Sequence, residues 1–252
     1  MPTARQRHND GVPLDVVPGG PVLVACAHGT RGSAGRRVVG SLVAALRSAR
    51  PGLRVEAAFV DVQPPRVGDV VRAATEAGRQ AVVVPLLLSG GYHVHVDVAR
   101  AVDGVTAVAA PALGPDDRIS GLLLDRLREA GATPQDAVVL AAAGSSDKRA
   151  AADVEQVRSR LAQQWPGPLT VGFGAAAKPS VPEAIAATRE QHPGCRVVVA
   201  SYLLAPGYFH DRLAESGADL VTPPLGRLDQ PIDPRLVDVV LDRYDVARRS
   251  LA

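Results

Sequence analysis

Two histidines and one aspartate stand where apolar stretches of this 252-residue chain end. His28, Asp61 and His93 follow the runs 22–27, 55–60 and 81–88, the last after a Ser-Gly-Gly turn. Imidazole and carboxylate groups from separate strands suit a divalent first-row metal, and three such ligands leave positions open for a substrate. The same groups suit proton transfer near neutral pH. The spacing therefore predicts a chemical site where three strands end.

The segments around these residues have the pattern of a parallel α/β sheet. Apolar runs without polar alternation are typical of strands that helices cover on both faces. Between the runs, residues 33–49 and 67–74 carry apolar side chains at helical spacing, and Pro51-Gly52 stops the first of them. Strands alternating with helices predict the α/β class, in which ligands bind beyond the carboxyl ends of the strands.

The same pattern extends along the whole chain. Strands are expected at 22–27, 55–60, 81–88, 105–109, 138–143, 169–173, 196–204 and 219–222. Helices are expected over 33–49, from 67, from 96 or 97, over 119–127 and 154–161, after Pro179 with Pro182 in the first turn, and over 236–244.

Three motifs of the first half of the chain recur in the second half. Leu-Leu-Ser-Gly-Gly-Tyr-His at 87–93 returns as Leu-Leu-Ala-Pro-Gly-Tyr-Phe at 203–209. Ala-His-Gly-Thr at 27–30 returns as Ala-Ala-Gly-Ser at 142–145, and Pro-Arg-Val at 65–67 returns as Pro-Ser-Val at 179–181. Matching positions are offset by 114 to 116 residues, and such constancy indicates an internal duplication.

The duplication predicts two similar lobes, each with a four-stranded parallel sheet flanked by helices. We expect residues 21–133 to form the first lobe and residues 134–252 the second, after a disordered lead-in at 1–20. The lobes are expected to pack about a pseudo-twofold axis with a cleft between them. A chain that already contains both lobes is expected to be a monomer.

The polar residues at the strand ends do not recur. The positions of His28, Asp61 and His93 correspond to Ala143, Ala175 and Phe209 in the second half. Residues that served only packing would be expected in both halves. The difference therefore predicts one working site in the first half and a degenerated copy in the second.

Composition and charge argue against several classes of protein. A formal net charge of +2 and 3% aromatic residues do not suit a nucleic-acid binder. No stretch approaches the roughly 20 apolar residues that span a bilayer. Cys26 and Cys195 both lie beside apolar runs, which predicts buried, reduced thiols of a cytoplasmic protein.

The segments 27–31, 59–61 and 85–93 together resemble the class II tetrapyrrole chelatases, most closely sirohydrochlorin chelatases of the CbiX/SirB type. The resemblance covers about residues 22–225. It implies that His28 and His93 bind the metal and act in its insertion. The family often has Glu at the end of the second strand, and the shorter Asp61 is expected to act through water or as a proton acceptor.

This resemblance implies an enzyme, a lyase that inserts a divalent metal into a carboxylated tetrapyrrole. Fe²⁺ insertion into sirohydrochlorin, giving sirohaem, is the first choice, and Co²⁺ insertion for cobalamin is the alternative. Two further hypotheses are a non-catalytic carrier of metal or tetrapyrrole, and a chelatase for a different tetrapyrrole such as a coproporphyrin. The metal would be a substrate, and no permanently bound cofactor is expected.

A substrate with several carboxylates calls for cationic side chains and free backbone N–H groups. The candidates are Arg31, Arg66, Ser89, Gly90 and Gly91 in the first half and Lys178, with Lys148 and Arg212, in the second. Two further histidines remain open. His95 is an alternate ligand or a polar residue of the next turn, and His210 contacts substrate or has a capping role.

Overall fold

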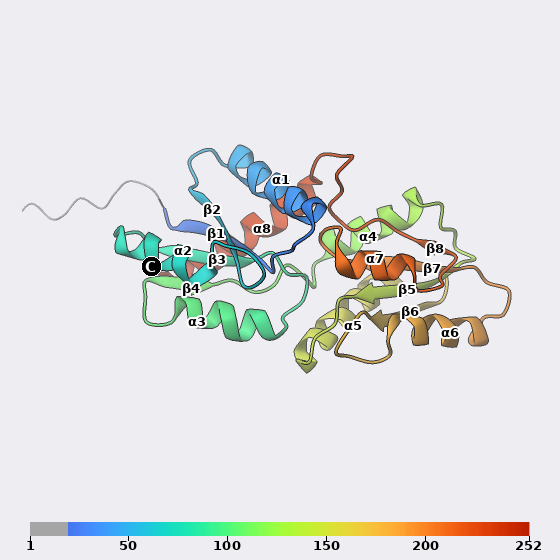
Figure 1. The fold of residues 1–252 in the computed structure, drawn as a ribbon. Helices are drawn as coiled ribbons and strands as arrows, with labels where there is room; N and C mark the ends of the chain where they lie inside the picture. Colours follow the sequence, from blue (N-terminus) through green and yellow to red (C-terminus); the bar gives the residue numbers. More distant parts are fainter. Residues whose placement is uncertain (1–19, 252) are drawn as a thin grey trace, which may run out of the picture.

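Two parallel four-stranded sheets stand side by side in the computed structural model, which describes residues 20–251 (Figure 1). Their strand orders are β2-β1-β3-β4 and β6-β5-β7-β8, so the two lobes share one topology and the predicted fold is confirmed. The lead-in at 1–19 lies outside the described residues. The strands are β1 (Val22–Ala27), β2 (Val55–Phe59), β3 (Ala81–Pro85), β4 (Ala107–Ala109), β5 (Ala137–Ala142), β6 (Leu169–Phe173), β7 (Val197–Tyr202) and β8 (Leu220–Val221).

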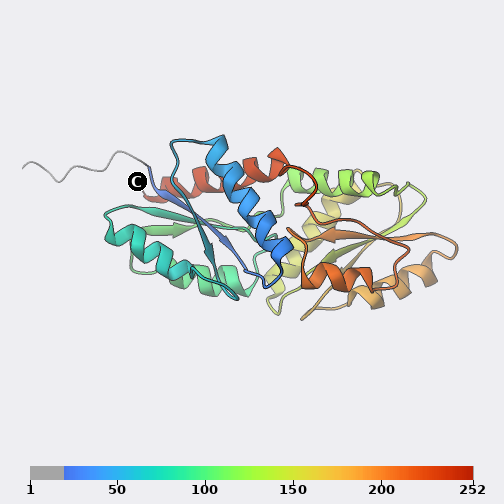
Figure 2. The ribbon, with the colours of Figure 1, turned by 45° about the horizontal axis from the view of Figure 1, so that its top comes forward.

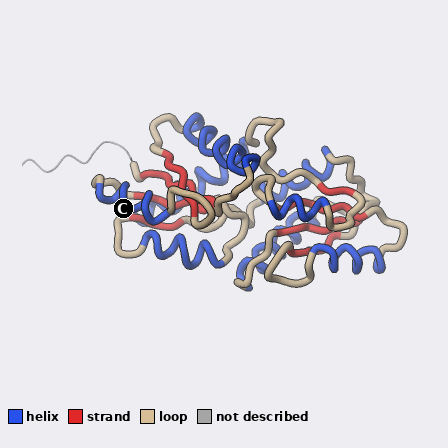
Figure 3. Tube along the Cα trace, in the orientation of Figure 1, coloured by secondary structure: helices blue, strands red, loops and turns tan. Residues whose placement is uncertain are grey.

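Helices cover both faces of each sheet, as the strand and helix colours of Figure 3 show. The central strands β1, β3, β5 and β7 are buried along their whole length, which explains their uninterrupted apolar sequence. The helices are α1 (Ser33–Ala49), α2 (Val67–Glu76), the π-helical η1 (His93–Val98), α3 (Ala99–Val102), α4 (Asp117–Glu129), α5 (Lys148–Ala162), α6 (Val181–Gln191), α7 (Tyr208–Ala214), α8 (Pro234–Ala247) and the 3₁₀-helical η2 (Arg248–Leu251).

Two helical segments differ from the sequence prediction. The helix expected to begin at 96 or 97 begins at His93, because its first turns are π-helical rather than α-helical. Helix α7 was not predicted at all. It has seven residues and only Leu213 is buried, so it carries no periodic apolar signal.

The two lobes exchange a helix. Helix α4 belongs to the first half of the sequence, yet it packs on α5 and β7 of the second sheet. Helix α8 comes from the second half and packs on α1 and β3 of the first sheet. Figure 2 shows α8 (dark red) beginning beside α4 and running back along the first lobe to the C-terminus. The predicted boundary at 133/134 thus separates the sequence repeats, while the packing of the helices crosses it.

This exchange produces one apolar core that runs through both lobes. A single cluster of buried side chains includes Leu23 of β1 and Leu46 of α1 in the first lobe. It continues through Leu122 of α4 to Leu140 of β5 and Leu161 of α5 in the second lobe. Two smaller clusters lie on the outer faces, under α2 and α3 in one lobe and under α6 and α7 in the other. Each fully buried aliphatic side chain contributes about 1.5–3 kcal/mol, so the shared cluster holds the lobes together.

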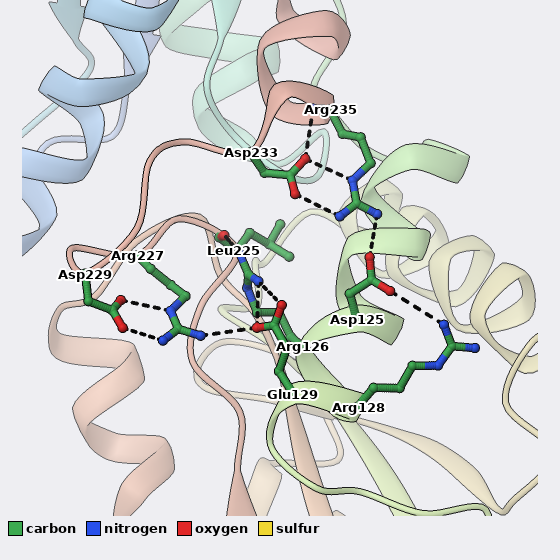
Figure 4. A network of polar contacts seen from close by, with 9 residues as sticks. All are labelled: Asp125, Arg126, Arg128, Glu129, Leu225, Arg227, Asp229, Asp233 and Arg235. Atoms are coloured by element: carbon green, nitrogen blue, oxygen red, sulfur yellow. Dashed lines mark hydrogen bonds and ion pairs between the residues drawn. The ribbon is translucent and has the colours of Figure 1, made fainter.

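An ionic network fixes the segment that leads the chain from β8 back to α8 (Figure 4). The Arg126 side chain, which is 5% exposed, donates to the carbonyl of Leu225 and pairs with Glu129 at 2.8 Å. Arg227 pairs with the same Glu129 carboxylate at 3.2 Å. At the start of α8, Arg235 pairs with Asp125 of α4 at 2.8 Å. The exchanged helices are therefore tied to each other where the chain crosses between the lobes.

None of the helices within residues 20–251 is both long and apolar enough to cross a membrane.

A buried carboxylate fixes the linker between the halves. Asp136 accepts hydrogen bonds from the backbone amide of Thr133 at 2.7 Å and from Arg196 at 2.7 Å, while Arg196 also donates to the carbonyl of Gly131. The Asp136 side chain is 8% exposed. These contacts, the Arg196 guanidinium first among them, hold the pKa of the Asp136 carboxyl below its usual range.

We expect Asp136→Ala to lower the free energy of unfolding by about 2 kcal/mol at pH 7, because the Thr133 amide and the Arg196 guanidinium both lose a charged acceptor. The native pKa of Asp136 lies below the unfolded value of about 3.9, so its contribution is complete at neutral pH and is lost as the pH falls through the native pKa. Urea unfolding at several pH values measures this. A stability difference that grew as the pH fell below 4 would contradict it.

The two cysteines differ in exposure. Cys26 lies on β1 and is fully buried, and burial together with the Asp97 carboxylate raises the pKa of its thiol to about 12. Cys195 is only partly buried, so the prediction that both thiols are buried is wrong for Cys195. It precedes β7, in a turn after α6.

We expect a thiol reagent to modify one cysteine of the native protein and both after denaturation, because attack requires an accessible thiolate. Mass spectrometry of the labelled protein identifies the site. A Cys195→Ser variant should take up no label in the native state. Native labelling of that variant would show that β1 is accessible and would contradict the burial of Cys26.

Candidate functional site

The topology of the first sheet places the site. The chain leaves β1 toward β2 on one side and returns to β3 on the other, so β1 and β3 flank the point where the strand order reverses. Crevices at such points, beyond the carboxyl ends of the strands, are the usual ligand sites of open α/β sheets. His28 follows β1 directly, and His93 is the first residue of η1 after β3.

The structure brings the two histidines together. Their ring centroids lie 4.6 Å apart with the ring planes at 87°. His28 is exposed, and the side chain of His93 is 34% exposed, so both rings are accessible to solvent. Tyr92, itself 53% exposed, stacks edge-on against His93 at 5.9 Å. The two imidazoles predicted from separate strand ends thus form one pair.

A carboxylate orients His93. Asp97 lies four residues later in η1, and its Oδ2 is 2.6 Å from Nδ1 of His93. The π-helical turn carries both groups, and π-helical segments are rare and frequent at functional sites. Carboxylates that hold the second nitrogen of an imidazole fix the ring and its tautomer. Asp97 is therefore part of the site, although the sequence did not single it out.

Both imidazoles keep the same nitrogen free. Nδ1 of His28 lies 3.3 Å from the carbonyl of Gly29, and Nδ1 of His93 faces Asp97. With the proton on Nδ1 and donated to these acceptors, each Nε2 is unprotonated and carries a free lone pair. Within the described residues neither Nε2 has a hydrogen-bond partner. Two neutral imidazoles with free Nε2 atoms can hold a metal ion or accept a proton.

Asp61 lies beside the two histidines, and a hydrogen bond from its backbone amide fixes its position. Its amide donates to the carbonyl of His28 at 3.0 Å, so the ends of β1 and β2 are joined. The Asp61 side chain is 59% exposed and pairs with Arg66 at 3.3 Å. A hydrogen bond from the Val62 amide, the Arg66 guanidinium and the nearby His28 ring together hold the pKa of the Asp61 carboxyl below its usual range.

Across the part of the chain that is described, no three His, Cys, Asp or Glu side chains form a group that could hold a metal ion. Asp61 is thus near the histidines without completing a three-ligand set. The arrangement that the structure does show is a pair of imidazoles with one carboxylate behind His93 and another beside His28.

The turns that carry these residues are retained in both lobes. Gly29 has φ 95°, and a Cβ there would stand 2.3 Å from the Asp61 carbonyl oxygen, so only glycine fits. Gly144 repeats this contact against Ala175. Val62 adopts φ 63°, a strained conformation for a β-branched residue, and Ala176 repeats it at φ 58°. The strained turn therefore belongs to the fold of both lobes, whereas the polar side chains of the site occur only in the first lobe.

The same comparison of halves identifies Asp97. At the offset that aligns His93 with Phe209, Asp97 aligns with Leu213. Four polar groups of the first site are thus replaced in the second by Ala143, Ala175, Phe209 and Leu213. Extending the alignment by one helical turn would have found Asp97, but only if the helix was known to begin at His93.

Of the predicted substrate-binding residues, the two glycines of the 89–91 loop have backbone amides that are already hydrogen-bonded. The amide of Gly90 already donates to Asp153 of α5 at 2.7 Å, and the amide of Gly91 donates to the Ser89 carbonyl. The loop at 89–91 therefore holds the two lobes together, and these two amides are not free. Cα of Gly91 packs so closely on Ser145 that an added Cβ would stand 3.0 Å from its hydroxyl oxygen.

The cationic candidates differ in how far they are engaged. Arg31 is exposed, and in the described residues its guanidinium has no hydrogen bond or ion pair. Arg66 is bound to Asp61 and to the Val60 carbonyl. Lys178 lies in the second lobe and pairs with Glu183 at 2.7 Å, which holds the pKa of Glu183 at about 2. Of these three candidates, all within the described residues, Arg31 is the one whose charge is unengaged.

His210 has a structural contact, since its Nε2 lies 3.2 Å from the Thr222 carbonyl at the end of β8. This favours the capping role over a contact with substrate. The side chain of His95 is not among those described.

Comparison with solved structures supports the fold. SirB from Bacillus subtilis, solved with Fe³⁺, matches with a TM-score of 0.74 at 20% identity, covering 90% of this chain and 94% of that one. SirB from Bacillus subtilis subspecies spizizenii, solved in complex with cobalt, matches with a TM-score of 0.71 at 18% identity over 92% and 95%. CbiX of denitrifying bacteria, described as the terminal enzyme of sirohaem biosynthesis, matches with a TM-score of 0.63 at 18% identity over 90% and 99%.

A comparison with curated protein sequences found no match. The family model named CbiX matches twice, at residues 22–130 and at residues 137–246. These two matches correspond to the two halves inferred from the repeated motifs. Because they cover most of the sequence, the resemblance drawn from its motifs is confirmed, and the chain belongs to the CbiX family.

Proposed function

We propose that this protein is a sirohydrochlorin chelatase that inserts a divalent metal into the carboxylated macrocycle, with Fe²⁺ as the preferred metal and Co²⁺ as the alternative. The observation that carries the proposal is the pair of imidazoles at the ends of β1 and β3, each with Nδ1 engaged and Nε2 free. Membership in the CbiX family and the fold shared with SirB support it.

The chemistry needs a loosely held metal and a base. Insertion of M²⁺ forms bonds from the metal to the ring nitrogens and releases two pyrrole N–H protons. Imidazole nitrogens bind first-row divalent metals, and two protein ligands leave most coordination positions to water and then to the macrocycle. In this mechanism His28 and His93 present the metal through Nε2. Asp97 keeps the His93 ring in the orientation and tautomer that this requires.

The two pyrrole protons are accepted by the imidazoles rather than by Asp61, one on each Nε2 after that nitrogen has released the metal to the ring nitrogens. A carboxylate whose pKa is held below its usual range is a weak base at neutral pH, whereas imidazole titrates close to it. Asp61 instead stands beside His28 as a carboxylate paired with Arg66. We assign the carboxylates of the macrocycle first to Arg31, because its guanidinium is unengaged, and then to Arg66.

We expect His28→Ala and His93→Ala each to reduce metal insertion by about 100-fold or more while the protein stays folded, because each variant removes a ligand and a base. The measurement is anaerobic turnover of sirohydrochlorin with Fe²⁺, Co²⁺ or Ni²⁺, followed by absorbance. His192→Ala is the matched control, since His192 lies after α6 in the second lobe. Its turnover should equal that of the unmodified protein.

Turnover that survived in both histidine variants would contradict the proposal. Uptake of one equivalent of metal or tetrapyrrole, without further turnover, would instead identify a carrier. The relative rates with the three metals rank iron against cobalt.

We expect Asp97→Ala to weaken Co²⁺ binding by about 10- to 100-fold, the usual effect of removing a group that orients a ligating histidine. Asp97→Asn keeps an acceptor but loses the charge, so its Co²⁺ affinity should fall between those of the unmodified protein and Asp97→Ala. Titration of the visible absorbance of Co²⁺ measures the affinity. Asp103→Asn, an exposed residue at the end of α3, is the control. Equal affinity of Asp97→Ala and this control would show that Asp97 does not act through His93.

A further inference from the structure

The second lobe has a cavity where the first lobe has its histidines. It measures about 250 Å³ and lies at the carboxyl ends of β5 and β7, the point where the strand order of the second sheet reverses. Phe209 and Leu213, which line it, align with His93 and Asp97. Two of the four positions that replace polar groups of the first lobe thus line a cavity in the second lobe.

The wall of this cavity is mostly apolar. Phe173 and Phe209 supply aromatic rings to it. Its apolar lining includes Ala141, Ala142, Phe173, Leu203, Phe209 and Leu213. A volume below the roughly 300–1,000 Å³ of drug-sized sites limits the occupant to a small molecule, and the two rings favour an aromatic or similarly flat apolar body.

One cation stands at the rim without a partner. Within residues 20–251, the Arg212 guanidinium makes no ion pair or hydrogen bond, although it lines the cavity. The hydroxyl groups of Ser180 and Ser216, also at the rim, already donate to Glu183 and to the Leu213 carbonyl. The carboxylate of Glu183 is itself neutralised by Lys178 at 2.7 Å. Arg212 therefore provides the one unengaged charged donor of the rim, and its sign selects an anion.

We propose that this cavity is a binding site for a small carboxylate with an apolar body. The acid group would pair with the Arg212 guanidinium, in the bidentate geometry that arginine favours with carboxylates, and the apolar body would fill the space against Phe173 and Phe209. The site is separate from the paired histidines and uses only residues of the second lobe.

Binding of phenylacetate to the full-length protein tests this, with ligand-observed NMR titration as the readout. We expect phenylacetate to bind, and the neutral isostere phenylacetamide to bind about tenfold more weakly, since it lacks the charge that Arg212 pairs with. Arg212→Gln should weaken phenylacetate binding by about the same factor, and Arg212→Lys by less. Arg249→Gln, an exposed arginine in η2, is the matched control and should leave binding unchanged.

A second variant tests the apolar part. Ala142→Leu places a larger side chain at the end of β5 and should abolish binding of both compounds, with a thermal melt confirming that the variant is folded. Absence of phenylacetate binding, equal affinity for the amide, or an Arg212→Gln effect no larger than that of Arg249→Gln would each overturn the proposal. These readouts need no metal insertion, so they are independent of the proposed chelatase activity.

The same chemistry could come from a free acid or from a carboxylate arm of the macrocycle. Adding sirohydrochlorin to the phenylacetate complex separates the two sources. Displacement of phenylacetate would identify an arm of the macrocycle as the natural occupant, and simultaneous binding would identify a separate acid. Either result supports a carboxylate site in this cavity.

Discussion

Burial of apolar surface by the exchanged helices is the constraint on which the rest of this structure depends. Each sheet is apolar on both faces, and each requires helical cover. The first sheet takes α8 from the end of the chain, and the second takes α4 from the middle. The lobes therefore cannot separate without exposing Leu122 or Leu236, both fully buried. This shared core fixes how the strand ends of one lobe face the loops of the other.

The contacts between those loops follow from that arrangement. Gly90 of the first lobe is bound by Asp153, and Tyr202 of the second donates to the Leu88 carbonyl at 2.6 Å. The first contact joins the loop after β3 to α5, and the second lies at the end of β7. The loop that precedes His93 is thus positioned from both sides, by its own sheet and by the neighbouring lobe. Such support limits the freedom of the site without contributing a ligand to it.

The sequence was sufficient for everything that depends on local pattern. Buried strands were found because their apolar runs are continuous, and His28 and His93 were found because the repeat lacks them. The pairing of Asp97 with His93 was missed because it depends on a π-helical turn that no periodicity reveals. The exchange of α4 and α8 was missed for a different reason. An amphipathic helix carries an apolar face, but nothing in its pattern states which sheet that face will cover.

The position of α8 has a consequence for the order of folding during synthesis. Helix α8 closes the first sheet, yet its residues, 234–247, are translated after both sheets. While the ribosome makes the second half, β1 and β3 lack that helix on the face that carries Leu23 and Val84, and only α1 of the first half is available to cover the shared core there. The histidine-bearing lobe is consequently the first to begin folding and among the last to be completed.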